Sequence, residues 1–297
     1  MARLNQNIVI PDNTRLETSY QLYDSDIDSI TFGKNIEICG NYIFACSQQI
    51  RELYIPDKTI FSGYGIFYCS SGLQNLRIGD NVKLKGCYLF QNCSNLESIA
   101  FGHSTIISGT SCFSGLIRLQ RLQFSPNMTF SAFYLFAECD TIREVIIPDN
   151  CTIRGDFFFK NCPRLERIVI GNNVVIQGSK CFHECTGLKS IIIGDNVTIS
   201  GINFLEGCFV NQNVELTIGS GYVGYPINIP MPILRIEKFG DVKGTLRFES
   251  IECMISFEEF KDDSDVIVLV CGHVFLLDPL QIWLGTQKVC PTCRQKI

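Results

Sequence analysis

The amino-acid sequence predicts a mainly β protein in which a solenoid of 23-residue units is followed by a small α+β zinc-binding domain. Two observations carry this prediction. Phenylalanine recurs with a period of 23 residues along most of the chain, and a period of this length is typical of repeat architectures. The last 47 residues hold a Cys-x-His and a Cys-x-x-Cys motif, which are spaced like metal ligands. We therefore expect the solenoid over residues 1–218, its cap and a connector over 219–250, and the zinc domain over 251–297.

The repeat is defined by columns of apolar residues. Seven phenylalanines lie 23 residues apart: Phe44, Phe67, Phe90, Phe113, Phe136, Phe159 and Phe182. Leucine or isoleucine follows each of them after six residues, and isoleucine or phenylalanine follows after eleven. One unit of this length cannot bury its apolar face alone, whereas stacked units form a continuous core. We therefore expect the phenylalanine column to lie inside the solenoid.

Within each unit, apolar residues alternate in two short runs, as at 188–193 and 197–199. Alternation with a period of two is typical of strands. Gly-Asp-Asn separates these two runs at 194–196, and Gly-Asp-Asn or Pro-Asp-Asn recurs at 79–81 and 148–150. Asp and Asn bond to their own backbone and tolerate left-handed conformations, so the triplets predict turns. Each unit is thus expected to contribute two short strands joined by a turn.

The units resemble the BspA-like class of leucine-rich repeats, in which an apolar strand and a turn precede a Phe-x-x-Cys-x-x-Leu segment. The segments at 159–165 and 182–188 match that pattern, and the resemblance extends over roughly residues 8–218. Members of this class serve as adhesins, scaffolds and partner-recognition arms. The resemblance therefore implies a surface that binds a protein partner, without saying which one.

Twelve cysteines lie within residues 1–218, and five of them occupy one column: Cys93, Cys139, Cys162, Cys185 and Cys208. A disulfide ladder and a metal array are two interpretations of this column. A third, which we favour, is a column of buried thiols that act as small hydrophobic side chains. A solenoid already has a core and does not need the disulfides that stabilise small secreted scaffolds. Reduced thiols would also fit a cytoplasmic, reducing compartment.

The composition argues against several functions. The hydrophobic share of 46% and the charged share of 19% suit a packed core. The net charge is −5, and no part of the chain has the basic excess that nucleic acid or an anionic membrane would attract. No apolar run reaches the roughly 18 residues of a membrane span, and the N-terminal sequence lacks a signal-peptide pattern. We expect no nucleic-acid partner, no membrane partner, and no hydrolase or oxidoreductase activity in the solenoid.

The strongest chemical motif lies near the C-terminus. Cys271 and His273 are followed by Cys290 and Cys293, and these four side chains suffice for one tetrahedral zinc site. A lone Cys-x-x-Cys could equally be a redox pair, but the two motifs together favour zinc. A module of this size with few large apolar residues would be marginal without a metal. We therefore expect one zinc ion per chain.

These residues resemble a RING domain, whose pattern has eight ligands for two zinc ions. Cys253 stands at the first ligand position, and the four residues of the predicted site stand at the third, fourth, seventh and eighth. Ser256, Leu276 and Pro279 replace the second, fifth and sixth ligands. The resemblance thus implies one complete zinc site and one lost site, as in the SP-RING group of SUMO ligases, and leaves Cys253 as a bystander. Apolar residues would then replace the lost metal by packing: Phe257, Phe260, Leu276, Leu277 and Leu280.

RING ligases bind a ubiquitin-conjugating enzyme through a small set of residues, and the resemblance extends to them. Ile255, Trp283 and Pro291 match the three docking positions, and Arg294 matches the basic residue that contacts both the conjugating enzyme and ubiquitin. Such a ligase has no nucleophile and acts by positioning the reactants. We expect Ile255 and Trp283 to be partly exposed and Arg294 to be outside any internal ion pair.

Two functions remain open from the sequence, with a third in reserve. In the first, the solenoid binds a protein substrate and the zinc domain recruits a ubiquitin-conjugating enzyme. In the second, the protein is a non-enzymatic scaffold whose zinc module is a folded cap or an interaction module. The lost first zinc site favours the scaffold, whereas the intact docking residues favour the ligase. Transfer of SUMO rather than ubiquitin is the third alternative.

Overall fold

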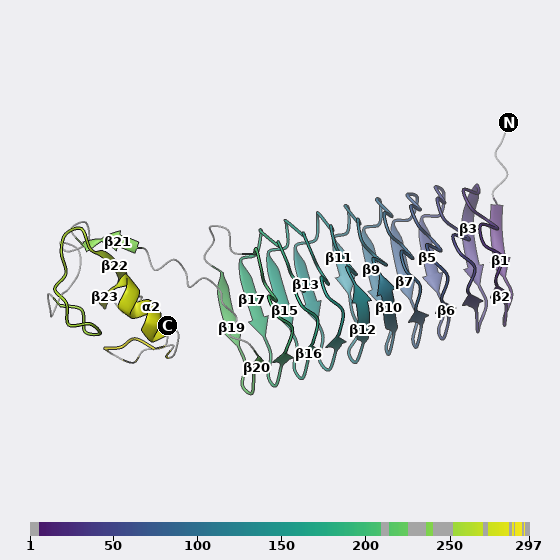
Figure 1. Ribbon diagram of the computed structural model, residues 1–297. Helices are drawn as coiled ribbons and strands as arrows, with labels where there is room; N and C mark the ends of the chain where they lie inside the picture. The colour runs from purple at the N-terminus through teal and green to yellow at the C-terminus, as the bar shows by residue number, and fades with distance from the viewer. Residues whose placement is uncertain are drawn as a thin grey trace. The chain divides into compact units, whose positions relative to one another are not determined.

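The computed structural model describes residues 6–208, 214–224, 236–239, 252–269, 273–284, 287, 289–292 and 294. The chain forms two compact units, Met1–Ile229 and Pro230–Ile297 (Figure 1). The first is a solenoid of short parallel strands. The second is a small sheet with a helix. Among the described residues, no helix has the length and apolar character needed to cross a membrane.

The solenoid has strands along two sides. One side carries β1 (Gln6–Ile10), β3 (Ile27–Phe32), β5 (Glu52–Ile55), β7 (Asn75–Ile78), β9 (Ser98–Phe101), β11 (Arg121–Gln123), β13 (Glu144–Ile147), β15 (Arg167–Ile170), β17 (Ser190–Ile193) and β19 (Glu215–Ile218). A second side carries β2 (Arg15–Leu16), β4 (Glu37–Ile38), β6 (Ile60–Phe61), β8 (Lys83–Leu84), β10 (Ile106–Thr110), β12 (Thr129–Phe133), β14 (Thr152–Ile153), β16 (Val175–Ile176), β18 (Thr198–Ile199) and β20 (Val223–Gly224). The two strands per turn that the apolar alternation predicts are thus confirmed.

The two sides differ in continuity. Strands β2 to β20 form one ten-stranded parallel sheet, whereas the odd-numbered strands form three sheets that begin at β1, β5 and β13. Within a sheet, the residue that follows one strand donates its N–H to the last residue of the neighbouring strand in the preceding turn. Gly79, after β7, donates in this way to the carbonyl of Ile55 in β5 at 2.8 Å. Pro56 and Pro148 take that position after β5 and β13. Because proline has no N–H, this bond cannot form at the two places where a new sheet begins.

The phenylalanine column lies in the core, as predicted. All seven rings are at most 1% exposed, and neighbouring rings of the column stack with centroids 5.0 to 5.6 Å apart. Apolar strand residues surround the rings and pair in register with the next turn, as Ile168 does with Ile191. Each turn therefore buries one ring against the rings of its two neighbours.

The cysteine column consists of buried, free thiols, which confirms the favoured interpretation. Each thiol also donates a weak hydrogen bond to a phenylalanine carbonyl of the preceding turn; Cys185 reaches Phe159 at 3.0 Å and Cys208 reaches Phe182 at 2.7 Å. Burial raises the pKa of two other buried thiols, Cys112 and Cys181, to about 12. These thiols are neutral hydrogen-bond donors at physiological pH.

The Asp-Asn turns join successive units as well as reversing the chain. Asn81, Asn150 and Asn196 have left-handed φ values of 57°, 60° and 55°. The preceding turn residue accepts a hydrogen bond from the backbone of the next unit: Asp149 Oδ1 accepts from the N–H of Asn172 at 2.7 Å. The residue types that mark these turns in the sequence therefore also link the turns along the stack.

Residues 219–250, expected to be one cap and connector, contribute to both units. Strand β20 pairs with β18 and continues the solenoid to Gly224, with a spacing of 25 rather than 23 residues between partners such as Thr198 and Val223. That change of spacing hides the turn from a search for a strict repeat. Strand β21 (Ile236–Lys238) instead pairs with β22 (Asp265–Val268) in the second unit.

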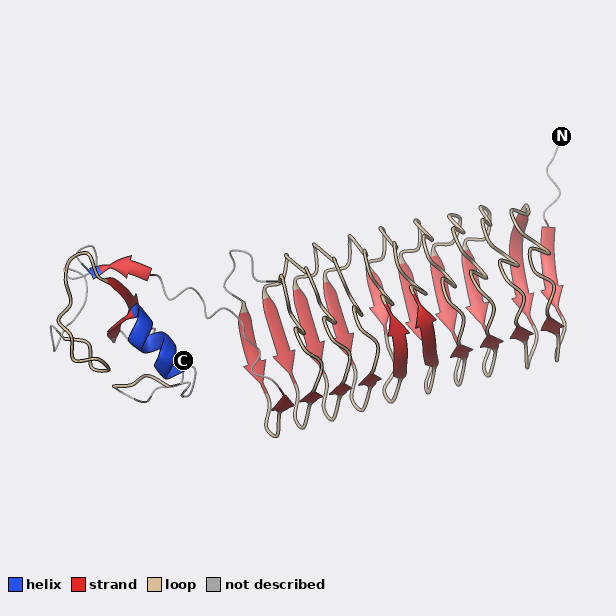
Figure 2. Ribbon diagram, in the orientation of Figure 1, coloured by secondary structure: helices blue, strands red, loops and turns tan. Residues whose placement is uncertain are grey.

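The second unit is built on the three-stranded antiparallel sheet β21–β22–β23, with β23 at Val274–Leu276. Helix α2 (Leu277–Leu284) follows β23 directly (Figure 2). Phe275 and Leu280 are fully buried and form its core with Ile267, Leu269, Cys253 and Cys290. The unit is therefore α+β, as predicted.

Candidate zinc-binding and docking site

Two turns of the second unit have the same backbone geometry. The N–H of Phe257 donates to the carbonyl of Cys253 at 2.7 Å, and the N–H of Arg294 donates to the carbonyl of Cys290 at 3.0 Å. Phe257 and Arg294 both adopt a left-handed φ, of 59° and 61°. Both cysteines are fully buried. The first turn thus keeps the backbone form of the Cys-x-x-Cys turn although Ser256 replaces its second cysteine.

The hairpin β22–β23 positions the predicted histidine ligand. Val268 pairs with Val274, and the N–H of Leu269 donates to the carbonyl of His273 at 2.8 Å. His273 is half-buried at the start of β23. The other two predicted ligands, Cys271 and Cys293, lie outside the described residues. Within the described part of the chain, no three His, Cys, Asp or Glu side chains are grouped as a metal site.

The donor chemistry of the four predicted ligands still fits zinc. Three thiolates and one imidazole are the soft and borderline ligands that zinc binds tetrahedrally. The positions of the first zinc site do not fit the metal, because Cys253 is joined there by a hydroxyl, an aliphatic side chain and a proline.

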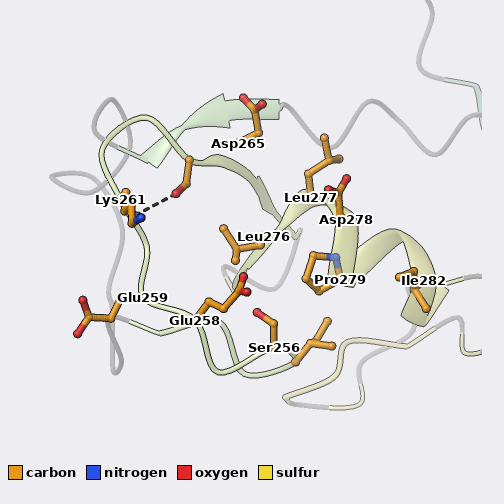
Figure 3. A pocket seen from close by; sticks show the side chains of 12 residues that line it. Ser256, Glu258, Glu259, Lys261, Asp265, Leu276, Leu277, Asp278, Pro279 and Ile282 are labelled. Atoms are coloured by element: carbon orange, nitrogen blue, oxygen red, sulfur yellow. Dashed lines mark hydrogen bonds between the residues drawn. The ribbon is translucent and has the colours of Figure 1, made fainter.

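A pocket lies at the positions of the lost site. Ser256, Leu276 and Pro279 all line it, together with the carboxylates of Glu258 and Asp278 (Figure 3). The hydroxyl oxygen of Ser256 is buried and has no hydrogen-bond partner within the described residues. The three residues that replace metal ligands of the RING pattern therefore lie together, and a pocket is open where the metal would be.

Apolar packing holds this part of the unit together, as expected, with one exception. Leu280 is buried in the core, and Phe260, Leu276 and Leu277 pack against it. Phe257 was expected to contribute as well, but its side chain is 72% exposed. The residue stands at the left-handed position that closes the Cys253 turn, and its side chain is directed away from the core.

The partial exposure expected of Ile255 and Trp283 is confirmed, whereas their role in docking stays a prediction. Ile255, Trp283 and Pro291 are each half-buried, and Arg294 is exposed. Trp283 lies in the last turn of α2, where its indole N–H donates to the carbonyl of Val289 at 2.9 Å. That bond fixes the orientation of the ring relative to the segment that leads into Cys290.

Arg294 lies against the face of Trp283. Its guanidinium carbon is 5.5 Å from the ring centroid, within the range of a cation–π interaction. Within the described residues, no ion pair involves Arg294. No sequence pattern predicts this contact, because the two residues are eleven positions apart and Arg294 lies outside the helix that carries Trp283. Arg294 is thus oriented by an aromatic ring and keeps its charge available.

Sequence reasoning also missed the exposure of three apolar side chains that lie near these residues in the sequence. Met254 is 52% exposed and Ile282 is 75% exposed, in addition to Phe257. Ile282 and Ile255 line the same pocket as Ser256. Exposed apolar side chains that gather in this way are typical of a protein-binding surface. Their one sequence signal is adjacency to Ile255 and Trp283.

Comparison with known families and structures agrees with both units. The model of the BspA type leucine rich repeat region matches residues 16–139 and 83–215, and the model of the Ring finger domain matches residues 251–294. A crystal structure of a leucine-rich repeat protein from Bacteroides ovatus is similar to this chain, with a TM-score of 0.53 over 64% of this chain and 49% of that one. The sequence identity is 20%, so this likeness concerns the fold alone.

Curated relatives match over the Ring finger region. The RING-H2 finger protein ATL39 of Arabidopsis thaliana is 44% identical over 48 residues, which is 16% of this chain and 36% of that protein. The E3 ubiquitin-protein ligase RING1-like of Arabidopsis thaliana is 42% identical over 52 residues, 18% of this chain and 16% of that protein. This chain therefore spans about a third or less of the length of these relatives.

Proposed function

Because this chain belongs to the BspA-type leucine-rich repeat family and carries a Ring finger domain at residues 251–294, we propose that it is a RING-type ubiquitin protein ligase. In this proposal the solenoid binds a protein substrate and the zinc domain recruits a ubiquitin-conjugating enzyme, in the cytoplasm. The observation that carries it is the presentation of Trp283 and Arg294: the ring is half-buried, and the guanidinium rests on it at the surface.

The mechanism requires positioning rather than a nucleophile. Ile255, Trp283 and Pro291 would contact the conjugating enzyme, and Arg294 would contact that enzyme and its attached ubiquitin. The ligase would restrain the ubiquitin-loaded conjugating enzyme in its reactive arrangement. That restraint removes part of the entropic barrier to ubiquitin transfer. The cation–π contact lowers the cost of ordering Arg294, because it already limits the side chain before the conjugate binds.

One zinc ion would hold this surface in shape, bound by Cys271, His273, Cys290 and Cys293. Its role when bound would be structural, because its ligands would come both from the β22–β23 hairpin and from the turn that ends in Arg294. Cys253 would remain a buried core residue without a metal.

The pocket at Ser256, Leu276 and Pro279 supports an alternative. A RING-like module without its first metal could serve only as a folded interaction module, and the protein would then be a scaffold. The two proposals differ in whether the intact chain accelerates ubiquitin transfer.

Discharge of ubiquitin from a panel of charged conjugating enzymes, measured with the full chain in single turnovers, tests the ligase. We expect acceleration by the wild-type protein and a loss of about tenfold or more in Arg294→Ala, with zinc content unchanged. Lys238→Ala is the matched control, because it removes another exposed cation of the same unit whose ion pair with Asp265 is worth little to stability. If no conjugating enzyme is discharged faster with the wild-type protein than without it, the scaffold is the better description.

A further inference from the structure

One position of the solenoid places aromatic side chains on strained backbone. The residue two positions before the core phenylalanine, or its equivalent, has a left-handed φ in each of nine successive turns: Tyr20, Tyr42, Gly65, Tyr88, Ser111, Tyr134, Phe157, Lys180 and Asn203. Glycine and asparagine suit this conformation, whereas bulky side chains there are uncommon and carry strain. Five of the nine residues are nevertheless aromatic. The aromatic rings must therefore be retained for another reason.

Stacking of these rings on the solenoid edge supplies part of that reason. The rings of Tyr20 and Tyr42 stack with centroids 5.3 Å apart, and those of Tyr134 and Phe157 stack with centroids 4.6 Å apart. The second stack also holds a cation: the ammonium of Lys160 lies 5.9 Å from the Tyr134 centroid and 5.5 Å from the Phe157 centroid. In this protein such a stack thus binds the side chain of a lysine.

The first stack lacks the corresponding lysine. Lys160 stands three residues after Phe157, and the residue three positions after Tyr42 is Ala45, which is fully buried. Tyr20 is 58% exposed, and its neighbour Tyr23, whose ring packs edge-on at 5.7 Å, is 45% exposed. The exposed rings of Tyr20 and Tyr23 therefore offer aromatic surface to a cation from outside the chain.

The charge around the first stack suits a cation as well. Four acidic residues and no basic residue lie between Arg15 and Lys34 in the sequence: Glu17, Asp24, Asp26 and Asp28. Glu17 pairs with Arg15 at 2.7 Å, and Asp28 accepts from the N–H of Gln6 at 2.7 Å, so neither of these two counts toward the charge at the stack. Asp24 follows Tyr23 directly, and its backbone N–H donates to the carbonyl of Ala45 at 2.9 Å, so its backbone runs along the same edge as the stack. Opposite charges at an interface favour one partner over others.

We propose that the acidic–aromatic patch, defined as Tyr20, Tyr23, Asp24 and Tyr42, is a docking site for a lysine- or arginine-rich segment of a protein substrate. A basic side chain of the substrate occupies the place over the tyrosine rings that Lys160 occupies over Tyr134 and Phe157, and Asp24 pairs with the same or the next cation. This inference names the substrate-binding surface and rests on the proposed function, in which the solenoid binds the substrate.

Binding of labelled peptides to the full-length chain tests the patch. Fluorescence anisotropy would compare a lysine/arginine-rich peptide with glutamate-rich and serine/glycine-rich peptides of equal length. We expect the basic peptide to bind at least about tenfold more tightly than the other two and to weaken with added salt, because charge attraction contributes to the contact. Tyr20→Leu should weaken basic-peptide binding about fivefold, the equivalent of a cation–π contact of about 1 kcal/mol.

Two variants separate the ring from other effects of substitution. Tyr20→Phe keeps the aromatic face and should retain binding. Tyr54→Leu removes a tyrosine that is 54% exposed on β5, outside the patch, and should also retain binding. The proposal is overturned if the three peptides bind alike, or if Tyr20→Leu binds the basic peptide as well as Tyr54→Leu does. The assay contains no conjugating enzyme, so loss of peptide binding with intact ubiquitin discharge refutes the patch alone, and the reverse result refutes the ligase alone.

Discussion

Removing the ring of Phe136 should destabilise the solenoid more than any exposed substitution nearby. Phe136 is fully buried and stacks on Phe113 at 5.2 Å and on Phe159 at 5.0 Å. Three further rings contact it edge-on, those of Phe101, Phe124 and Phe158, at 6.5, 5.7 and 5.9 Å. Truncation of a buried phenylalanine to alanine costs about 3–5 kcal/mol. Five lost aromatic contacts place Phe136→Ala in the upper half of that range, because such pairs add to the burial of area.

Thermal unfolding followed by circular dichroism measures the effect. For a unit of 229 residues, about 4 kcal/mol corresponds to a fall in Tm of roughly 8–16 °C. Phe133→Ala is the matched control, since Phe133 lies in the same turn, is 47% exposed and should cost under about 1 kcal/mol. Hydrogen exchange would add the spatial pattern: protection should fall most in the turns of Phe113 and Phe159 and less with distance. Equal effects of the two variants, or a loss of protection that is uniform along the solenoid, would refute the stacking argument.

Three further predictions concern the zinc domain and the thiols. Metal analysis of the reduced protein should find one zinc per chain, unchanged in Cys253→Ala and lost together with folding of the module in Cys290→Ala; two zinc ions in the wild type would contradict the lost first site. Trp283→Leu should slow ubiquitin discharge by severalfold while zinc stays bound, since both the docking ring and the support of Arg294 are lost. Discharge at the wild-type rate would show that the ring and its cation–π contact are dispensable. The pKa values of about 12 for Cys112 and Cys181 mean that these thiols stay neutral as pH rises to about 10, so a thiolate-specific alkylating reagent should modify them only after unfolding, as mass spectrometry of the labelled peptides would reveal.

The solenoid was predictable because its core repeats one requirement. Each turn must place a ring of similar size at the same core position, where it stacks on the rings of the neighbouring turns. The phenylalanine column therefore keeps a constant spacing from Phe44 to Phe182. The cap was harder to predict because both residues of β20 are exposed, and the 25-residue step between Thr198 and Val223 takes this turn out of the 23-residue frame.

The candidate site was predictable only where residue type decides the chemistry. Cysteine and histidine have few reasons to recur at ligand spacing, so His273 and Cys290 stand out in the sequence. The stacking of Arg294 on Trp283 depends on the path of the chain between two elements, which no local pattern encodes. The outward orientation of Phe257 depends on a left-handed backbone that residue type argues against.

The break in pairing after β11 gives the solenoid a preferred place to bend. Between β11 and β13 the odd-numbered side can open without breaking strand-to-strand hydrogen bonds, whereas the ten-stranded sheet on the other side keeps its length. Pro148, directly after β13, has no N–H to pair β13 with β11, and Pro56 has none to pair β5 with β3. With one continuous side and two unpaired places on the other, the solenoid has three stretches of full pairing, and we expect any change of curvature to concentrate between them.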